Sequence, residues 1–279
     1  MRAALVQLCS GDDPAANLAA TEGLVREAAA GGAGLVLTPE CTNIVSLDRE
    51  RQRAVLREEA EDGTLARLRE VARELSLWLV VGSLCLRAGG GDGRFVNRSF
   101  LIGPGGEVRA RYDKIHMFDV ALKGGEAYRE SAAYRPGTQA VLAEAAGLRL
   151  GMTVCYDLRF PRLYRDLARA GAEVLSVPSA FTVPTGEAHW HVLLRARAIE
   201  TGAYVLAPAQ WGTHPAAGGK ARRTYGHSLA VAPWGEVVAD AGEGVGVVFA
   251  EVDPGEVARA RAMVPSLGHD RDYAPPVRP

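Results

Sequence analysis

Two segments of the chain carry the same turn-containing motif, and this repeat constrains the fold more than any other feature. Ser99-Phe-Leu-Ile-Gly-Pro104-Gly-Gly-Glu-Val108 and Ser228-Leu-Ala-Val-Ala-Pro233-Trp-Gly-Glu-Val237 share the pattern S-x-x-h-x-P-x-G-E-V, where h is hydrophobic. The offset between them is 129 residues, from Ser99 to Ser228. Because a Pro/Gly turn between two apolar runs is typical of a β-hairpin, the motif predicts equivalent hairpins in two similar halves.

A second similarity lies upstream of each hairpin. Leu24–Ala33 followed by Leu35–Pro39 resembles Leu163–Ala172 followed by Val174–Pro178, at an offset of 139 residues from Pro39 to Pro178. Chance similarity between two Ala-rich helices is the alternative. Taken as a repeat, it predicts that each half runs strand, helix, strand, helix, strand, hairpin.

Apolar runs that alternate with helical stretches favour an α/β layered fold. A sheet covered by helices on one face must bury its other face, and packing the two sheets together satisfies both halves. We therefore expect a four-layer αββα sandwich, with residues 1–279 as one domain. In the first half the expected elements are Ala3–Leu8, a helix opened by Asp13-Pro14, Leu35–Thr38, a helix near Asp62–Leu75, and Leu77–Val81.

Charge and cysteine content exclude several classes of partner. The 279 residues contain 32 Lys and Arg against 33 Asp and Glu, so no global field attracts nucleic acid or an anionic membrane. The four cysteines have neither CxxC nor zinc-ligand spacing, which favours a reducing, cytoplasmic location. No apolar run is long enough to span a membrane, and Met1–Leu8 is interpreted as a first strand rather than a signal peptide.

The fourth cysteine, Cys155, closes the strand-like run Leu148–Val154 and precedes a helical stretch. A cysteine at such a corner lies near a helix N-terminus, whose partial positive charge lowers the thiol pKa. Judged by position alone, an inert buried cysteine is the alternative.

Two charged residues also occupy unusual positions. Glu40 comes at the C-terminal end of the strand Leu35–Thr38, where open α/β sheets bind ligands; a solvated cap is the alternative. Lys114 lies among apolar and aromatic residues in Tyr112–Phe118, and the alternative is a lysine whose head reaches water.

Together, a carboxylate base, a cation and a thiol are the groups needed for acyl transfer through a thioester. Three motifs resemble the Glu, Lys and Cys motifs of the nitrilase superfamily of carbon–nitrogen hydrolases, and Pro178–Phe181, Gly186–Glu200 and Tyr225–Ser228 extend the resemblance over effectively the whole chain. The motifs are Leu37-Thr-Pro-Glu40, Tyr112-x-Lys114-Ile-His-x-Phe118-Asp119 and Gly151-x-x-Val-Cys155-Tyr-Asp157-x-Arg159-Phe160.

The resemblance implies the αββα fold, a homodimer or higher homo-oligomer, and roles for the three residues. Glu40 would be the general base, Cys155 the nucleophile, and Lys114 with the Tyr156 backbone N–H would hold the oxyanion. The family often has a second glutamate between Lys and Cys, and Glu130 matches it, with Glu126 as the competing candidate.

The implied substrate is a small-molecule amide and no cofactor is implied. Deaminated glutathione is the first expectation, followed by α-keto acid amides, as for an omega-amidase, and then by N-carbamoyl amino acids. Arg159 is a candidate to receive a substrate carboxylate, with a structural ion pair to Asp157 as the alternative. Phe181 and Thr182 are candidates for the pocket wall, with plain core packing as the alternative.

The sequence predicts no metal site. His189 and His191 are two residues apart, and in a helix such side chains point about 200° away from each other, so they cannot bind one ion together. A catalytically silent binding protein on the same fold is the non-enzyme alternative. That alternative predicts the loss of Glu40, Lys114 or Cys155, and all three are present.

Overall fold

The computed structural model describes residues 1–121, 127–218 and 221–277. The helices are α1 (Pro14–Ala30), α2 (Arg49–Val55), α3 (Gly63–Leu75), α4 (Pro161–Arg169), α5 (Val183–Thr201) and α6 (Pro254–Met263), with 3-10 turns η1 (Glu59–Glu61), η2 (Glu130–Ala132), η3 (Cys155–Arg159) and η4 (Ser266–Gly268). The strands are β1 (Arg2–Gln7), β2 (Leu35–Leu37), β3 (Trp78–Arg87), β4 (Phe95–Ile102), β5 (Val108–Asp113), β6 (Asp119–Ala121), β7 (Ala127–Arg129), β8 (Val141–Ala145), β9 (Leu148–Met152), β10 (Val174–Ser176), β11 (Tyr204–Ala207), β12 (Trp211–Thr213), β13 (Arg223–Tyr225), β14 (Leu229–Val231), β15 (Val237–Asp240) and β16 (Gly246–Glu251).

Among the described residues, two six-stranded sheets correspond strand for strand, in the orders β16-β1-β2-β3-β4-β5 and β8-β9-β10-β11-β14-β15. In each sheet three parallel strands are followed by an antiparallel hairpin. The predicted hairpins are β4–β5 and β14–β15. Both have a register shift at the equivalent place, between Leu101 and Ile102 and between Ala230 and Val231. The two halves are therefore similar down to a local irregularity.

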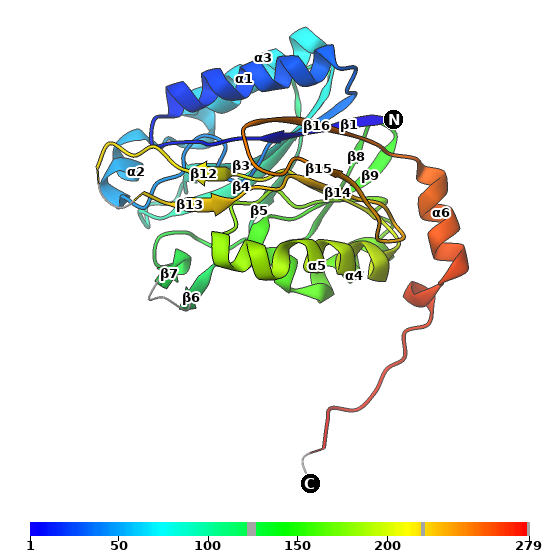
Figure 1. Ribbon diagram of the computed structural model, residues 1–279. Coiled ribbons are helices and arrows are strands. Elements are labelled where there is room, and N and C mark those ends of the chain that lie inside the picture. The colour runs from blue at the N-terminus through cyan, green and yellow to red at the C-terminus, as the bar shows by residue number, and fades with distance from the viewer. Residues whose placement is uncertain (122–126, 219–220, 278–279) are drawn as a thin grey trace.

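The layers form the predicted αββα sandwich. Figure 1 shows α1 and α3 over one sheet and α4 and α5 over the other. Along β1 the side chains alternate: Ala3 and Leu5 share a buried cluster with the second sheet, whereas Ala4 and Val6 pack with residues of α1 and α3. The sheets thus bury their inner faces against each other, as expected.

Two helices of the first half begin at aspartate caps, and the cap predicted at Asp13-Pro14 is one of them. The side chain of Asp13 accepts a hydrogen bond of 3.0 Å from the Ala15 N–H, and Pro14 is the first residue of α1. Asp62 caps α3 in the same way, accepting from the Leu65 N–H at 2.8 Å. No helix in the described part of the chain is both long and apolar enough to cross a membrane.

The outer strands were not predicted. β16, near the C-terminal end of the chain, pairs with β1, and β8 pairs with β9, so each half gains an antiparallel strand at its edge. Beyond β16, α6 packs Val257 into the core, and the chain after η4 extends away from the sandwich (Figure 1).

Candidate active site

Glu40, Lys114 and Cys155 meet in one cavity, although they come from distant parts of the chain. The cavity encloses about 760 Å³ of space continuous with solvent. Its wall is formed by residues from both halves, among them Glu40, Asn97, Lys114, Phe118, Tyr128, Glu130, Cys155, Tyr156, Ala180, Phe181, Thr185 and Arg222. The structure thus brings these three residues to the same cavity.

Glu40 is held by hydrogen bonds at both carboxylate oxygens. It follows Pro39 after the end of β2 and is 3% exposed. Its Oε1 accepts from Nδ2 of Asn97 at 2.9 Å and from Nζ of Lys114 at 2.9 Å, and its Oε2 accepts from the Ala180 N–H at 2.9 Å. Such a carboxylate is fixed in position.

Lys114 is buried between two carboxylates. It follows β5, its backbone N–H donates to the Asn97 carbonyl, and its side chain is 2% exposed. Nζ lies 2.9 Å from Oε1 of Glu40 and 2.9 Å from Oε2 of Glu130. The alternative of a lysine whose head reaches water does not describe this residue. A buried ammonium paired in this way is a fixed positive charge beside the thiol.

Cys155 occupies a strained turn. It opens η3 with a φ of 51°, a left-handed conformation that few residues other than glycine adopt, and its N–H donates to the Pro178 carbonyl at 2.9 Å. Asp157 stabilises this turn through hydrogen bonds: its Oδ2 accepts from the Tyr112 hydroxyl at 2.6 Å and from the Val154 N–H at 2.9 Å. The Cys155 thiol and the Glu40 carboxylate line the same cavity, and each shifts the pKa of the other.

The electrostatics correct one expectation. Burial raises the pKa of the Cys155 thiol well above its usual value, the Glu40 carboxylate raises it further, and Lys114 opposes them. The helix N-terminus alone predicted a lower pKa, but η3 is a single 3-10 turn and desolvation dominates. At neutral pH the resting cysteine is a thiol, so it needs a base.

Glu40 is ionised and Lys114 is protonated in this setting. Burial alone would raise the pKa of Glu40, but the charges of Lys114 and Arg222 outweigh it and hold that pKa below its usual value. Burial alone would lower the pKa of Lys114, but the carboxylates of Glu130 and Glu40 raise it well above normal. The site therefore contains an ionised base, a cation and a neutral nucleophile.

The second glutamate at Glu130 lies where it can act on Lys114. Both of its oxygens accept from Nζ, at 3.1 and 2.9 Å, and Oε2 also accepts from the Phe118 N–H at 2.6 Å. Glu126, the competing candidate, lies outside the described residues.

Two of the four expected substrate-binding residues line the cavity and two do not. Tyr156 and Phe181 are part of the wall. Arg159 stacks its guanidinium over both of these rings, 5.9 and 5.6 Å from their centroids, and its Nη2 lies 3.2 Å from Nδ1 of His189. Thr182 is the N-cap residue of α5, with its hydroxyl 2.8 Å from that of Thr185, which does line the cavity.

Sequence reasoning missed Arg222 and Asp157 as site residues. Arg222 precedes β13 and lines the cavity, donating from Nη2 to the Ala180 carbonyl at 2.6 Å. Its buried Nε has no hydrogen-bond partner among the described residues. The cysteine motif contains Asp157 but predicts only an ion pair with Arg159 for it, whereas its carboxylate accepts hydrogen bonds from Tyr112, His116 and the Val154 N–H. Neither role has a local sequence pattern, because both depend on contacts with distant segments.

Comparison with known proteins identifies the family of the chain. The family model described as carbon-nitrogen hydrolase matches residues 2–262. The deaminated glutathione amidase of Yersinia enterocolitica is 42% identical over 270 residues, covering 96% of this chain and 92% of the relative. The human deaminated glutathione amidase is 40% identical and covers 96% of this chain and 81% of its own.

Solved structures show the same similarity. Saccharomyces cerevisiae Nit3, a member of branch 10 of the nitrilase superfamily, superposes with a TM-score of 0.83 at 30% identity, covering 95% of this chain and 94% of Nit3. A glutamate-to-glutamine mutant of an amidase from Nesterenkonia, in which acrylamide has added to the active site cysteine, gives a TM-score of 0.76 at 28% identity, covering 95% and 98%. The chain therefore belongs to the carbon-nitrogen hydrolase family, within the nitrilase superfamily, and is an amidase that cleaves carbon–nitrogen bonds other than peptide bonds.

Proposed function

We propose that this amidase hydrolyses the amide of a small carboxylate-bearing molecule to acid and ammonia through a thioester on Cys155, with deaminated glutathione as the preferred substrate. The observation that carries the substrate class is Arg222. Its guanidinium lines the same cavity as the thiol, and its buried Nε has no partner among the described residues. A substrate carboxylate would supply the acceptor that this donor lacks.

The proposed reaction begins with Glu40 as the base. Glu40 takes the thiol proton, and the sulfur of Cys155 attacks the amide carbonyl carbon. Lys114 and the Tyr156 backbone N–H hold the negative charge on the former carbonyl oxygen. Glu40 then returns the proton to the nitrogen, and the C–N bond breaks to release ammonia and leave the thioester. The mutual influence of Glu40 and Cys155 on each other's pKa, in one shared cavity, and the raised thiol pKa support this assignment.

Water completes the cycle. Glu40 takes a proton from a water molecule that attacks the thioester carbonyl, and the C–S bond breaks to restore the thiol and release the acid. Glu130 would orient Lys114 and this water, which its bidentate contact with Nζ supports. No step needs a cofactor or a metal ion.

Two arginines compete for the substrate carboxylate. Arg159 lies next to the cavity wall, and it could receive a carboxylate that reaches past Tyr156 and Phe181. Arg222 lies in the wall itself, so we assign it the role of binding the substrate carboxylate. Arg159 then supports the rings of Tyr156 and Phe181. The names of the relatives, deaminated glutathione amidases, agree with an acidic substrate.

We also propose that the enzyme is a single-domain cytoplasmic homodimer that acts without nucleic acid or membrane partners. One buried cluster contains residues of both sheets, which supports a single domain. All four cysteines are free, and Sγ of Cys41 and Sγ of Cys85 lie 3.4 Å apart without a bond, which suits a reducing compartment. Val192 and Ile199 on α5 and the neighbouring Trp234 are 68%, 54% and 52% exposed, an apolar stripe that a second copy would cover.

A substrate panel tests the function. Ammonia release is measured with deaminated glutathione, α-keto acid amides, N-carbamoyl amino acids and neutral aliphatic amides of similar size. We expect the highest kcat/KM for deaminated glutathione and the lowest for the neutral amides. A preference for neutral amides would reject the carboxylate assignment. Light scattering coupled to gel filtration tests the dimer, with Val192→Glu as the variant expected to be monomeric.

A further inference from the structure

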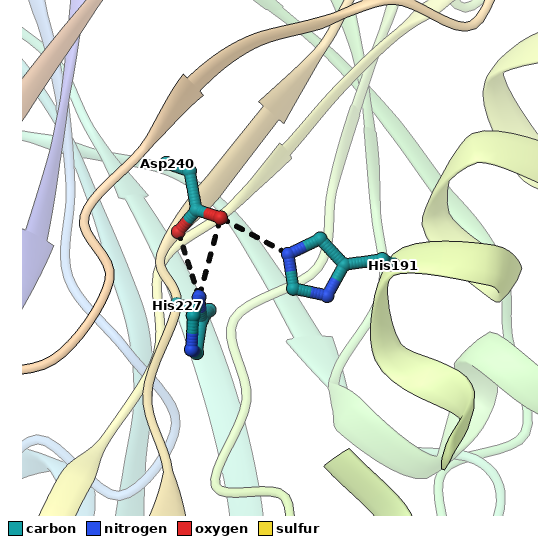
Figure 2. Close-up of side chains that lie close together, drawn as sticks. All are labelled: His191, His227 and Asp240. Carbon is teal, nitrogen blue, oxygen red and sulfur yellow. Dashed lines mark hydrogen bonds and ion pairs between the residues drawn. The ribbon is translucent and has the colours of Figure 1, made fainter. Parts of the chain in front are cut away.

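The structure brings together two histidines and an aspartate that are distant in sequence (Figure 2). His191 lies on α5, His227 precedes β14, and Asp240 ends β15. Nε2 of His191 is 3.0 Å from Oδ2 of Asp240, and Nδ1 of His227 is 2.9 Å from Oδ1. Sequence spacing did not reveal this cluster, because its three residues come from separate elements. We propose that His191, His227 and Asp240 form a binding site for a divalent transition-metal ion such as Zn²⁺, separate from the active site.

The three donors suit this class of ion. Two imidazole nitrogens and one carboxylate oxygen form a common ligand set for zinc and its neighbours. One donor atom from each residue lies within 4.8 Å of the others. Tetrahedral zinc with bonds of about 2.0–2.1 Å separates its ligand atoms by roughly 3.4 Å. The two contacts with Asp240 would therefore lengthen by a few tenths of an ångström, whereas any donor pair near the 4.8 Å limit would have to move closer. A fourth position is left for water.

His227 is oriented before any ion binds. Its φ is 56°, a left-handed conformation that residues with a Cβ rarely adopt. Its N–H donates to the Gly242 carbonyl at 3.0 Å, and its carbonyl accepts from Nε1 of Trp190 at 2.8 Å. Its ring stacks on Tyr225 with centroids 4.5 Å apart. These contacts fix the ring toward Asp240, as supporting residues do in metal sites.

Asp240 is fixed in a similar way. Its Oδ1 also accepts from the Gly242 N–H at 2.8 Å. The side chains of His191, His227 and Asp240 are 34%, 23% and 32% exposed, so a hydrated ion can reach them from solvent. His189, two residues before His191, lies against Arg159 instead and takes no part, as the helical spacing predicted.

The location indicates a structural role. None of the three residues lines the active-site cavity, but Trp190, which is anchored to the His227 carbonyl, packs against Phe181 of the cavity wall with ring centroids 4.8 Å apart. An ion here would link α5 to the β14–β15 hairpin behind that wall. The proposal rests on this cluster alone and does not depend on the substrate.

Isothermal titration calorimetry tests the site: ZnCl₂ is titrated into the metal-free full-length chain. We expect one ion per chain, and binding weakened at least about tenfold in His191→Gln and in Asp240→Asn, since each removes a ligand. His189→Gln is the matched control on the same helix and should bind as the wild type does. Saturating zinc should raise the Tm of the wild type and of the control but not of the two ligand variants.

Cobalt replaces zinc in a second measurement that separates this site from the thiols. Co²⁺ bound at this cluster should show d–d bands without a sulfur charge-transfer band, and His227→Asn, which tolerates the left-handed backbone, should abolish those bands. Equal Tm values in EDTA show that the variants are folded. Absence of zinc binding in the wild type, undiminished binding in the ligand variants, or a sulfur band in the one-ion complex would each overturn the proposal.

Discussion

The backbone N–H of Ala180 donates a hydrogen bond of 2.9 Å to Oε2 of Glu40, although 140 residues separate the two. Glu40 follows Pro39 beyond β2, and Ala180 comes two residues after Pro178 beyond β10, the corresponding strand of the other half. The base of the candidate site is therefore fixed by the opposite half of the repeat. The position of Glu40 depends on how closely the two halves approach.

Gly82 controls that approach, and Gly82→Ala should disrupt it. A Cβ at this position would lie 1.9 Å from the Thr38 carbonyl oxygen and 2.5 Å from Cβ of Pro178. Because both neighbours are held by the sheets, we expect a loss of stability of at least about 1–3 kcal/mol and a large fall in turnover. Gly23→Ala is the matched control: it lies in α1 with open space around it and should be neutral or stabilising by up to about 1 kcal/mol. Equal Tm values for Gly82→Ala and Gly23→Ala would mean that Gly82 does not control the approach of the two halves.

The fold class could be predicted from the sequence because short local patterns mark its hairpins and the start of its first helix. Each hairpin has its own Pro/Gly turn, and α1 begins at its own Asp13-Pro14 cap, so the repeat can be seen without any long-range contact. The pairing of β16 with β1 could not be predicted, because it joins the two ends of the chain and no pattern marks it. The same limit hid the meeting of His191, His227 and Asp240.

Sequence motifs pointed to three residues that share one cavity, but they gave no information on the energetics of that cavity. Glu40, Lys114 and Cys155 were found through motifs, whereas the pKa of Cys155 depends on how much protein covers the thiol. Arg222 Nε is buried because other segments pack around it. In the sequence Arg222 is only one charged residue in a polar stretch, so nothing there marks it as a binding group. Desolvation is a property of the folded chain and has no local pattern.

Cys155 should be the one cysteine that turnover requires. Cys155→Ala removes the nucleophile, so ammonia release should fall to background. Cys9→Ala, Cys41→Ala and Cys85→Ala should each retain most activity, although Cys41 and Cys85 line the cavity. Turnover by Cys155→Ala above that of a heat-inactivated sample would rule out the thioester mechanism.

Arg222→Met should change specificity more than rate. Losing a hydrogen bond to a charged group costs about 1.5–3 kcal/mol, so we expect kcat/KM for deaminated glutathione to fall by roughly 10–100-fold, mainly through KM. A neutral amide should be affected much less, and Arg222→Lys should retain part of the preference. Arg159→Met is the control and should leave the ratio of acidic to neutral substrate near the wild-type value. If Arg159→Met lowered that ratio and Arg222→Met did not, Arg159 would be assigned as the residue that binds the substrate carboxylate.

Removing the Arg222 charge should also move the acid limb of the pH profile. Burial raises the pKa of Glu40, but the positive charges of Lys114 and Arg222 outweigh burial and hold that pKa below its usual value. Without the Arg222 charge the Glu40 pKa rises, so the base is protonated at a higher pH. The acid limb of kcat/KM for a neutral amide should therefore shift to higher pH in Arg222→Met and stay in place in Arg222→Lys.

Glu130→Gln should lower kcat while leaving KM almost unchanged, because Glu130 positions Lys114 through two contacts. A fall of about tenfold corresponds to ~1.4 kcal/mol of lost transition-state stabilisation. Glu126→Gln provides the comparison, because the two glutamates compete for this role. If Glu126→Gln causes the larger loss, the register between Lys114 and the second glutamate has to be reassigned.

The titration of Cys155 should separate the roles of Lys114 and Glu40. Lys114 places a positive charge beside the thiolate and lowers the thiol pKa, whereas the Glu40 carboxylate raises it. Iodoacetamide labelling of Lys114→Met should therefore shift to higher pH, and labelling of Glu40→Gln should shift to lower pH. Turnover should fall in both, because the first loses an oxyanion donor, typically worth about 3 kcal/mol, and the second loses its base.

The labelling has to be assigned to Cys155, and the variant Cys155→Ala supplies the background from Cys9, Cys41 and Cys85. The groups are coupled, so the directions of the shifts carry the test and their sizes do not. Lys114→Met leaves Glu40 and Glu130 without their shared cation, so its Tm is measured alongside, and Lys114→Arg is included to retain the charge. Opposite shifts in Lys114→Met and Glu40→Gln, with little shift in Lys114→Arg, are the expected result. Unchanged profiles in folded variants would mean that neither charge acts on the thiol, and the assignment of the candidate site would then fail.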